Sequence, residues 1–110
     1  MTFLYLNSDK MGDGDPALGS KLMLAFLKNL AASDTPVDLV GCVNDGIRLT
    51  SEGSAALPYL KELESRGAQI ATCGTCLDHM GMQDRLAIGV VGNMEQTVQV
   101  MASADKIIRV

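Results

Sequence analysis

The chain of 110 residues has no tryptophan, and two tyrosines and two phenylalanines bring its aromatic content to only 4%. Few bases or sugars could therefore stack on aromatic side chains. Basic residues are also sparse, because nine Lys and Arg stand singly against 13 Asp and Glu and the net charge is −4. Without a basic face, the chain cannot displace the counterions of a nucleic acid. The composition excludes nucleic acid as an expected partner.

The sequence also lacks a long apolar run and a leader segment. No stretch approaches the roughly 20 apolar residues of a membrane span, and residues 1–6 contain neither a basic leader nor a small-residue cleavage site. We therefore expect a cytoplasmic protein with no membrane partner. In a reducing compartment, an odd count of three cysteines indicates catalytic, redox or metal-binding thiols rather than disulfides.

Strand-like and helix-like segments alternate along the chain, which is typical of a parallel sheet covered by helices. The length and a hydrophobic content of 47% suit one domain, residues 1–110. Strands are expected at residues 3–6, 37–43, 68–72, 86–90 and 106–110. We predict a three-layer α/β/α fold with a mainly parallel five-stranded sheet.

Capping signals place the helices between these strands. Asp15 and Pro16 begin a helix that runs to about residue 32, and Asn93 caps the last helix. A helix capped by Ser51 or Ser54 ends at residues 66–67, and a short one covers 76–80. Apolar residues recur at helical spacing in the first helix, at Leu18, Leu22, Ala25, Phe26 and Leu30. In the last helix, the residues expected to face the core are Val98, Met101 and Ala102.

Binding sites of parallel sheets lie beyond the carboxyl ends of the strands. Four loops meet this description, at residues 7–15, 43–50, 73–76 and 91–94. In the second loop, Asn44-Asp45-Gly46 is a turn signal, and Asn44 can donate a hydrogen bond to a ligand. In the fourth, Asn93 is first a helix cap, with a site role secondary.

The segment Cys73-Gly74-Thr75-Cys76 is the strongest candidate for chemistry. It stands where a strand passes into a helix, and the first turn of a helix favours the thiolate that attacks electrophiles and accepts sulfur. Gly74 would let backbone N–H groups approach an anionic sulfur, and Thr75 can donate a hydrogen bond. The functional interpretation is a persulfide carrier or a redox dithiol, and the alternative is a pair of buried structural thiols.

Known dithiol folds fit this segment poorly. A thioredoxin places its motif after an early strand and adds a later cis-proline. Here the motif follows the third strand, and Pro16, Pro36 and Pro58 all lie upstream. The thioredoxin fold is therefore disfavoured.

The sequence gives little support for a metal site or for a second catalytic group beside the cysteines. Cys73, Cys76 and His79 would need Cys42 or water to complete a zinc tetrahedron, and no fourth ligand is evident. His79 can act as a base one turn from Cys76 or be an ordinary exposed helix residue. Cys42 lies inside a strand and is expected in the core.

Acidic residues and glycines gather after the first strand without forming a known site. Asp9, Asp13 and Asp15 resemble the acids of a response-regulator receiver, but Cys73 stands where a receiver needs aspartate. A helix-capping turn is the better interpretation. No phosphate-binding glycine pattern is present, and we expect neither a cofactor nor a metal.

Several segments together resemble the DsrE/DsrF-like family, closest to the DsrE-like domain of YedF-type proteins. The resemblance covers about residues 4–110. Its residues are Leu18-Gly19, Val43 to Thr50, Cys73-Gly74-Thr75-Cys76-Leu77-Asp78 and Gly92-Asn93-Met94. It implies a DsrE/DsrF-like fold, a homo-oligomer, and a link to sulfur relay and selenium metabolism.

The resemblance also implies roles for individual residues. The spacing from Cys73 to Gly81 matches that of relatives whose cysteine accepts persulfide sulfur, so Cys73 takes that position and Cys76 is a second, resolving thiol. The donor would be a TusA-like sulfur carrier protein or another persulfide donor, supplied by another chain. The residues expected around the pocket are Gly74, Thr75, Asn44, Gly46, His79, Asn93 and Met94.

The leading hypothesis is a sulfurtransferase-like relay protein that carries sulfur, or selenium, on Cys73. Two alternatives stay open. One is a non-catalytic module that binds a small ligand or partner, with structural cysteines. The other is a dithiol/disulfide reductase.

Overall fold

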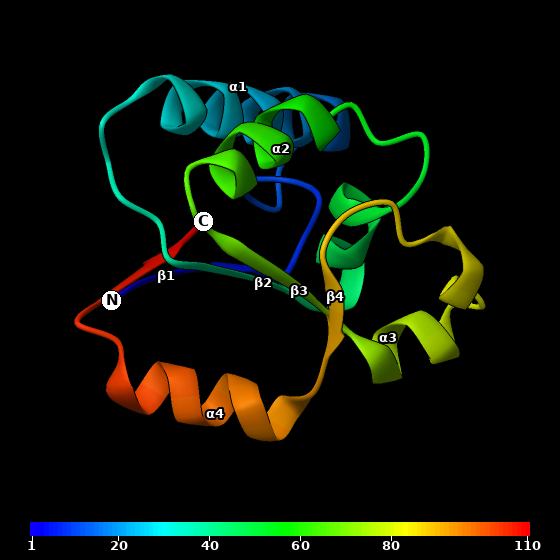
Figure 1. The fold of residues 1–110 in the computed structure, drawn as a ribbon. Coiled ribbons are helices and arrows are strands. Elements are labelled where there is room, and N and C mark those ends of the chain that lie inside the picture. Colours follow the sequence, from blue (N-terminus) through cyan, green and yellow to red (C-terminus); the bar gives the residue numbers. More distant parts are fainter.

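Short runs of apolar residues with a period of two form a five-stranded sheet in the computed structural model, which describes all 110 residues (Figure 1). All strand pairs are parallel, in the order β4-β3-β2-β1-β5. The strands are β1 (Thr2–Leu6), β2 (Leu39–Cys42), β3 (Gln69–Cys73), β4 (Val90–Gly92) and β5 (Lys106–Arg109). The predicted α/β class is confirmed, and the sheet is entirely rather than mainly parallel.

Helices cover both faces of the sheet, as right-handed crossover connections require (Figure 1). Helices α1 and α2 lie side by side on one face, α4 crosses the other, and α3 stands at the edge where the strands end. The α-helices are α1 (Pro16–Ala32), α2 (Leu57–Ser65), α3 (Gly74–His79) and α4 (Met94–Ser103). Two 3-10 helices complete the fold, η1 (Asn44–Thr50) and η2 (Gln83–Arg85). No helix has the length and hydropathy needed to cross a membrane.

The main core lies between the sheet and the α1–α2 layer. Leu4, Val40 and Ile70 pair across neighbouring strands and project to this side. They meet a single cluster of buried residues that includes Met23, Leu27, Leu60, Leu63 and Ile88. Burial of such side chains stabilises the fold by about 1.5–3 kcal/mol each.

Helix α1 begins as predicted, because the Asp15 side chain accepts a hydrogen bond from the Ala17 N–H. Its buried stripe, however, is Gly19, Met23, Leu27 and Leu30. Of the expected stripe, Leu30 is buried and Phe26 packs against the core, whereas Leu18 and Leu22 are 52% and 41% exposed. In the first half of the helix the buried positions, Gly19 and Met23, therefore lie one residue later than expected. The loop before the helix causes this, since the Met11 N–H bonds to the Gly19 carbonyl and a β-carbon on Gly19 would lie 3.0 Å from Lys10 Cβ.

In the last helix, α4, the side chains directed toward the sheet also differ from those predicted. Asn93 caps it by accepting a hydrogen bond from the Gln96 N–H, as expected. Yet no residue of α4 is buried, and Val98 is 59% exposed rather than inward-facing. The side of α4 toward the sheet is mostly polar, which leaves an open space there.

The fourth strand lies four residues later than predicted at its start. Residues 86–89 are not part of the strand, because Leu86 bridges antiparallel to Ser51 and Ile88 is buried in the core. Gly89 then turns with φ +77°, where a β-carbon would lie 2.2 Å from the Ile70 carbonyl oxygen. Only after this turn can the chain pair with β3, from Val90 onward.

Smaller differences concern element ends. Strand β2 is shorter than 37–43, and residues 44–50, expected as a loop with a turn at 44–46, form η1. Helix α2 begins after Ala56 without a side-chain cap, although the Ser54 hydroxyl accepts from the Ala56 N–H. Helix α3 starts at Gly74, two residues earlier than predicted.

Substituting Gly89 with alanine tests the packing that positions β4. We expect Gly89→Ala to lower the free energy of unfolding by about 3 kcal/mol, from a left-handed φ that costs about 1–2 kcal/mol and a clash that costs about 1–3 kcal/mol. Gly53→Ala is the matched control, since Gly53 has φ +85° with open space around it. Urea unfolding of both variants measures the difference, and equal losses would contradict the proposed contact.

Candidate functional site

The carboxyl ends of β2, β3 and β4 meet at one edge of the sheet. Cys42 pairs with Thr72, and Cys73 pairs with Gly92, so the loops after the three strands are neighbours. The structure therefore brings together three of the four predicted loops, around residues 44, 73 and 93. The fourth, after β1, borders β2 on its other side.

Cys73 is both the last residue of β3 and the cap residue of α3. It is 8% exposed, and lies on the same face of β3 as Ala71, the face toward α4. The next residue, Gly74, is tightly placed, since a β-carbon there would lie 2.9 Å from Val91 Cγ1. The close packing of Gly74 on β4 fixes where the Cys73 sulfur stands.

Cys76 lies in the first turn of α3 and is only partly buried. The backbone N–H of Asn44 donates a hydrogen bond to its Sγ, with an N···S distance of 3.2 Å. Burial raises the pKa of the Cys76 thiol above its ordinary value, the Asn44 N–H opposes this, and the Cys73 thiol raises it further. The net direction is upward, so Cys76 favours the protonated form.

The Asn44 N–H is aimed at sulfur by the backbone rather than by its side chain. Asn44 adopts φ +51°, a left-handed conformation that asparagine tolerates better than most residues. Gly46 is buried, and a β-carbon on it would lie 2.1 Å from the Leu6 carbonyl oxygen. Gly46 thus acts by close approach to β1.

The third cysteine does not belong to this pair. Cys42 projects to the α1–α2 side and is part of the main core, as its position within a strand predicted. Burial raises the pKa of its thiol to about 12. Cys42 therefore stays protonated at neutral pH and cannot serve as a nucleophile.

The other predicted site residues lie at the margins. His79 and Thr75 are exposed on α3, and Met94 is exposed at the start of α4. No three Cys, His, Asp or Glu side chains gather in a group that could hold a metal ion, so the zinc alternative lacks a ligand set. Asp15 is a helix cap, and Asp9 pairs with Lys10 at 3.0 Å.

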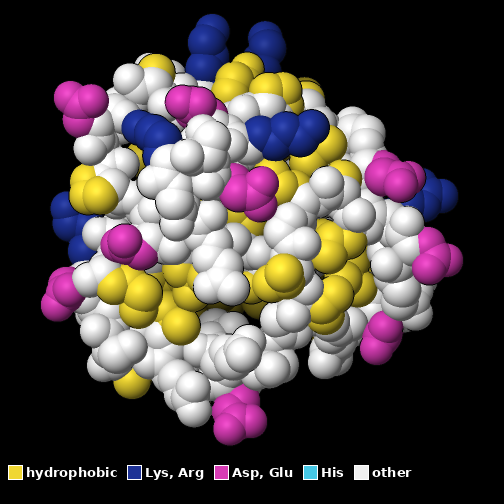
Figure 2. Space-filling model, in the orientation of Figure 1, with side chains coloured by type: hydrophobic (Ala, Val, Ile, Leu, Met, Phe, Trp, Pro, Cys, Tyr) yellow, Lys and Arg dark blue, Asp and Glu magenta, His cyan; other side chains and the backbone are white.

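A cavity of about 330 Å³ opens beside Cys73, between the sheet and α4. Figure 2 shows this band of the surface as hydrophobic and uncharged groups, with acidic and basic side chains above it and only acidic ones below it. Asn93, one of the residues expected around the pocket, lies on the lining of this cavity. The sequence reasoning missed the other polar lining residues, which are Gln69, Gln96, Thr97 and Gln99. The last three recur with Asn93 at helical spacing along α4, and this recurrence was the available signal.

Fold and site together define an α/β domain with a cysteine pair at the carboxyl end of an interior parallel strand. The sequence profile of the DsrE/DsrF-like family matches residues 18–110, and the chain belongs to this family. No curated protein matches the chain.

Two solved structures resemble the whole chain. One is a protein of unknown function, MTH1491 from Methanobacterium thermoautotrophicum, with 21% identity and a TM-score of 0.70. The other is the ychN protein from E. coli, with 20% identity and a TM-score of 0.71. In both comparisons 99% of this chain and 97% of the other are covered. At this identity the likeness establishes the fold.

The raised pKa of Cys76 predicts how this thiol reacts with iodoacetamide as pH increases. Because burial favours the protonated form, the alkylation rate of Cys76 should reach half its maximum at a higher pH in the folded protein than in the urea-unfolded chain. Quenched time points with mass-spectrometric localisation to Cys76 give the profile. A midpoint below that of the unfolded chain would show that the Asn44 N–H dominates instead.

Proposed function

We propose that this protein is a sulfur relay protein that carries sulfane sulfur as a persulfide on Cys73. The observation that carries the proposal is the pair of neighbouring thiols at the end of β3, one buried and one bonded by the Asn44 N–H. Membership of the DsrE/DsrF-like family, which includes sulfur relay proteins, supports it.

The chemistry begins with the Cys73 thiolate and a donor persulfide, R–S–SH. The Cys73 sulfur attacks the terminal sulfur, the donor S–S bond breaks, and the donor leaves as the thiolate R–S⁻. Cys73 then holds the terminal sulfur as Cys73–S–SH. Because Cys76 favours its protonated form, it can donate its S–H to the Cys73 sulfur and stabilise negative charge there.

Cys76 can remove the carried sulfur from Cys73 by two reactions. After losing its proton to water, Cys76 can attack the terminal sulfur as a thiolate, which moves the sulfur to Cys76 and leaves Cys73 as a thiolate. It can also attack the inner sulfur, which forms a Cys73–Cys76 disulfide and releases hydrosulfide, HS⁻. In either case the Asn44 N–H remains bonded to the Cys76 sulfur at the end of the reaction.

The finer assignment is to the YedF-type group, with selenium as an alternative cargo and a TusA-like carrier as donor. The segment Cys73-Gly74-Thr75-Cys76-Leu77-Asp78 and the later Asn93-Met94 support it. We include assembly into a homo-oligomer, because β4 and the adjoining part of α4 expose apolar side chains beside the thiols. These are Val90, Val91, Met94 and Val98.

A dithiol reductase is the second candidate, favoured by the same neighbouring thiols. It requires a reversible Cys73–Cys76 disulfide and turnover in a disulfide-reduction assay. A relay protein needs neither turnover nor a reductant to load its sulfur. The two functions are therefore separable by experiment.

Persulfide loading tests the proposal. After incubation with glutathione persulfide and removal of excess donor, the intact wild-type chain should gain the mass of one sulfur atom, which dithiothreitol removes. Cys73→Ser should lose this gain. Cys42→Ala, which changes a core thiol outside the pair, should keep it.

Three outcomes would overturn the assignment of Cys73: no added sulfur in the wild type, undiminished loading of Cys73→Ser, or loading that disappears in Cys42→Ala while that variant remains folded. Cys76→Ser should still load, because Cys76 acts after the sulfur has arrived. Circular dichroism of each variant checks the fold.

A further inference from the structure

Helix α4 covers the sheet without closing against it. A helix that packed directly would present an apolar stripe, but α4 and its cap line the cavity with four polar residues and one apolar one, which are Asn93, Gln96, Thr97, Gln99 and Val100. Its apolar residues Met94 and Val98 are 54% and 59% exposed. The resulting cavity, about 330 Å³, falls within the range of roughly 300–1,000 Å³ that is usual for small-molecule sites.

The floor of the cavity is a trough along the sheet. Gly41 and Ala71 pair with each other across β2 and β3 and leave little side chain above the strands. Phe3 walls one side, since a β-carbon on Gly41 would lie 2.8 Å from its ring. From Gln69 to Cys73 the trough follows the five residues of β3, whose four steps span about 13 Å at the rise of a strand. Its shape suits an elongated molecule.

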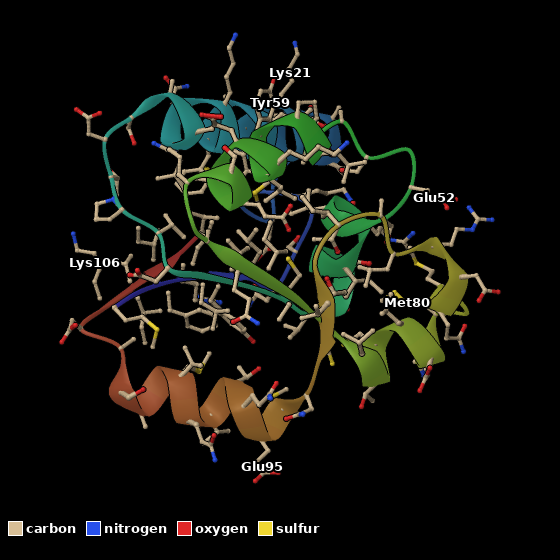
Figure 3. All side chains as sticks on the ribbon, viewed as in Figure 1. Lys21, Glu52, Tyr59, Met80, Glu95 and Lys106 are labelled. Atoms are coloured by element: carbon tan, nitrogen blue, oxygen red, sulfur yellow. The ribbon has the colours of Figure 1, made fainter.

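The cavity wall holds no Asp, Glu, Lys, Arg or His side chain. In Figure 3, Glu95 points away from the sheet beneath α4, and Lys106 lies at the opposite end of the helix from the thiols. A hollow of about 260 Å³ on the other side of the molecule is different, because Asp34, Asp38 and Arg66 line it. A charged ligand in the cavity beside α4 would lose part of its hydration without gaining an oppositely charged partner, which is costly.

Three carboxamides around the cavity are free to bind. The side-chain hydrogen bonds of α4 are made by Asn93, Thr97 and Ser103. The side-chain carboxamides of Gln69, Gln96 and Gln99 have no hydrogen-bond partner in the protein. Each carboxamide offers two donors and an acceptor. These groups match an uncharged ligand that both donates and accepts hydrogen bonds.

The cavity reaches only one of the two thiols. Cys73 lines it, whereas Cys76 does not and instead meets the Asn44 N–H. A ligand lying in the trough would therefore have one end at the Cys73 sulfur. Cys76 is partly exposed outside this cavity.

From these features we infer that the cavity between the sheet and α4 is a binding site for a small, elongated, uncharged molecule with amide-like hydrogen-bonding groups, and that one end of this molecule meets Cys73. The inference goes beyond the sulfur relay. Binding in the cavity requires no persulfide.

Two thiol reagents of matched shape test the inference. N-benzyl-2-chloroacetamide is elongated, uncharged and carries an amide, and its 4-carboxy derivative adds one negative charge. In both, the thiolate sulfur forms a bond to the chloromethyl carbon and chloride leaves. Rates at Cys73 are measured in Cys76→Ser, and rates at Cys76 in Cys73→Ser, by mass spectrometry.

The neutral reagent should modify Cys73 at a rate that saturates with its concentration, because binding precedes reaction. The neutral-to-charged rate ratio should be about tenfold higher at Cys73 than at Cys76, since only the cavity penalises the carboxylate. No saturation and equal ratios would overturn the inference. So would a Cys73 that reacts with neither reagent, or one that becomes protected as protein concentration rises, which would indicate that a second copy fills the cavity.

Two lysine substitutions on α4, each made in the Cys76→Ser background, provide the matched control. Gln96→Lys places a positive charge at the cavity, and Ala102→Lys places the same charge at an exposed position of α4 outside it. Gln96→Lys should lower the neutral-to-charged ratio at Cys73 about tenfold by supplying a partner for the carboxylate. Ala102→Lys should leave the ratio within about twofold, and equal effects of the two substitutions would refute a site at the cavity.

Discussion

The approach of the Gly46 backbone to the end of β1 is the contact on which the site depends. A β-carbon at this position would overlap the Leu6 carbonyl oxygen, at 2.1 Å. That carbonyl also accepts the Val43 N–H at 3.0 Å, which ties the start of η1 to the edge of the sheet. Asn44 must then turn into the left-handed region, with φ +51°. The turn directs its N–H at the Cys76 sulfur, so a steric constraint at β1 becomes a hydrogen bond at the cysteine pair.

The two thiols consequently differ in their surroundings although they lie one helical turn apart. Cys76 is partly buried beneath η1, where desolvation outweighs the Asn44 N–H and keeps the thiol protonated. Cys73 faces a cavity walled by carboxamides and apolar residues. A persulfide on Cys73 would stand between a proton donor on one side and an uncharged pocket on the other. This asymmetry is what a relay needs, because the sulfur must be held without being released to water.

Local chemistry made much of the fold predictable, and contacts distant in sequence made the rest unpredictable. Caps at Asp15 and Asn93 depend on neighbouring residues and were confirmed. The start of β4 depends on Gly89 meeting Ile70, nineteen positions away in the chain, which no local pattern encodes. At the site, the cysteine motif was visible in the sequence, but the glutamines were not. A polar helix face ordinarily indicates solvent, and only the three-dimensional arrangement shows that this one faces the sheet.

The central claim is that Cys73, between the cavity and Cys76, holds the transferred sulfur. A crystal structure of the protein after reaction with a persulfide donor, with anomalous diffraction recorded to locate sulfur atoms, tests this claim most directly. The account predicts an additional sulfur bonded to Cys73 Sγ and directed toward the cavity, with the Asn44 N–H still bonded to Cys76. An additional sulfur on Cys76 alone, with Cys73 unmodified, would contradict it.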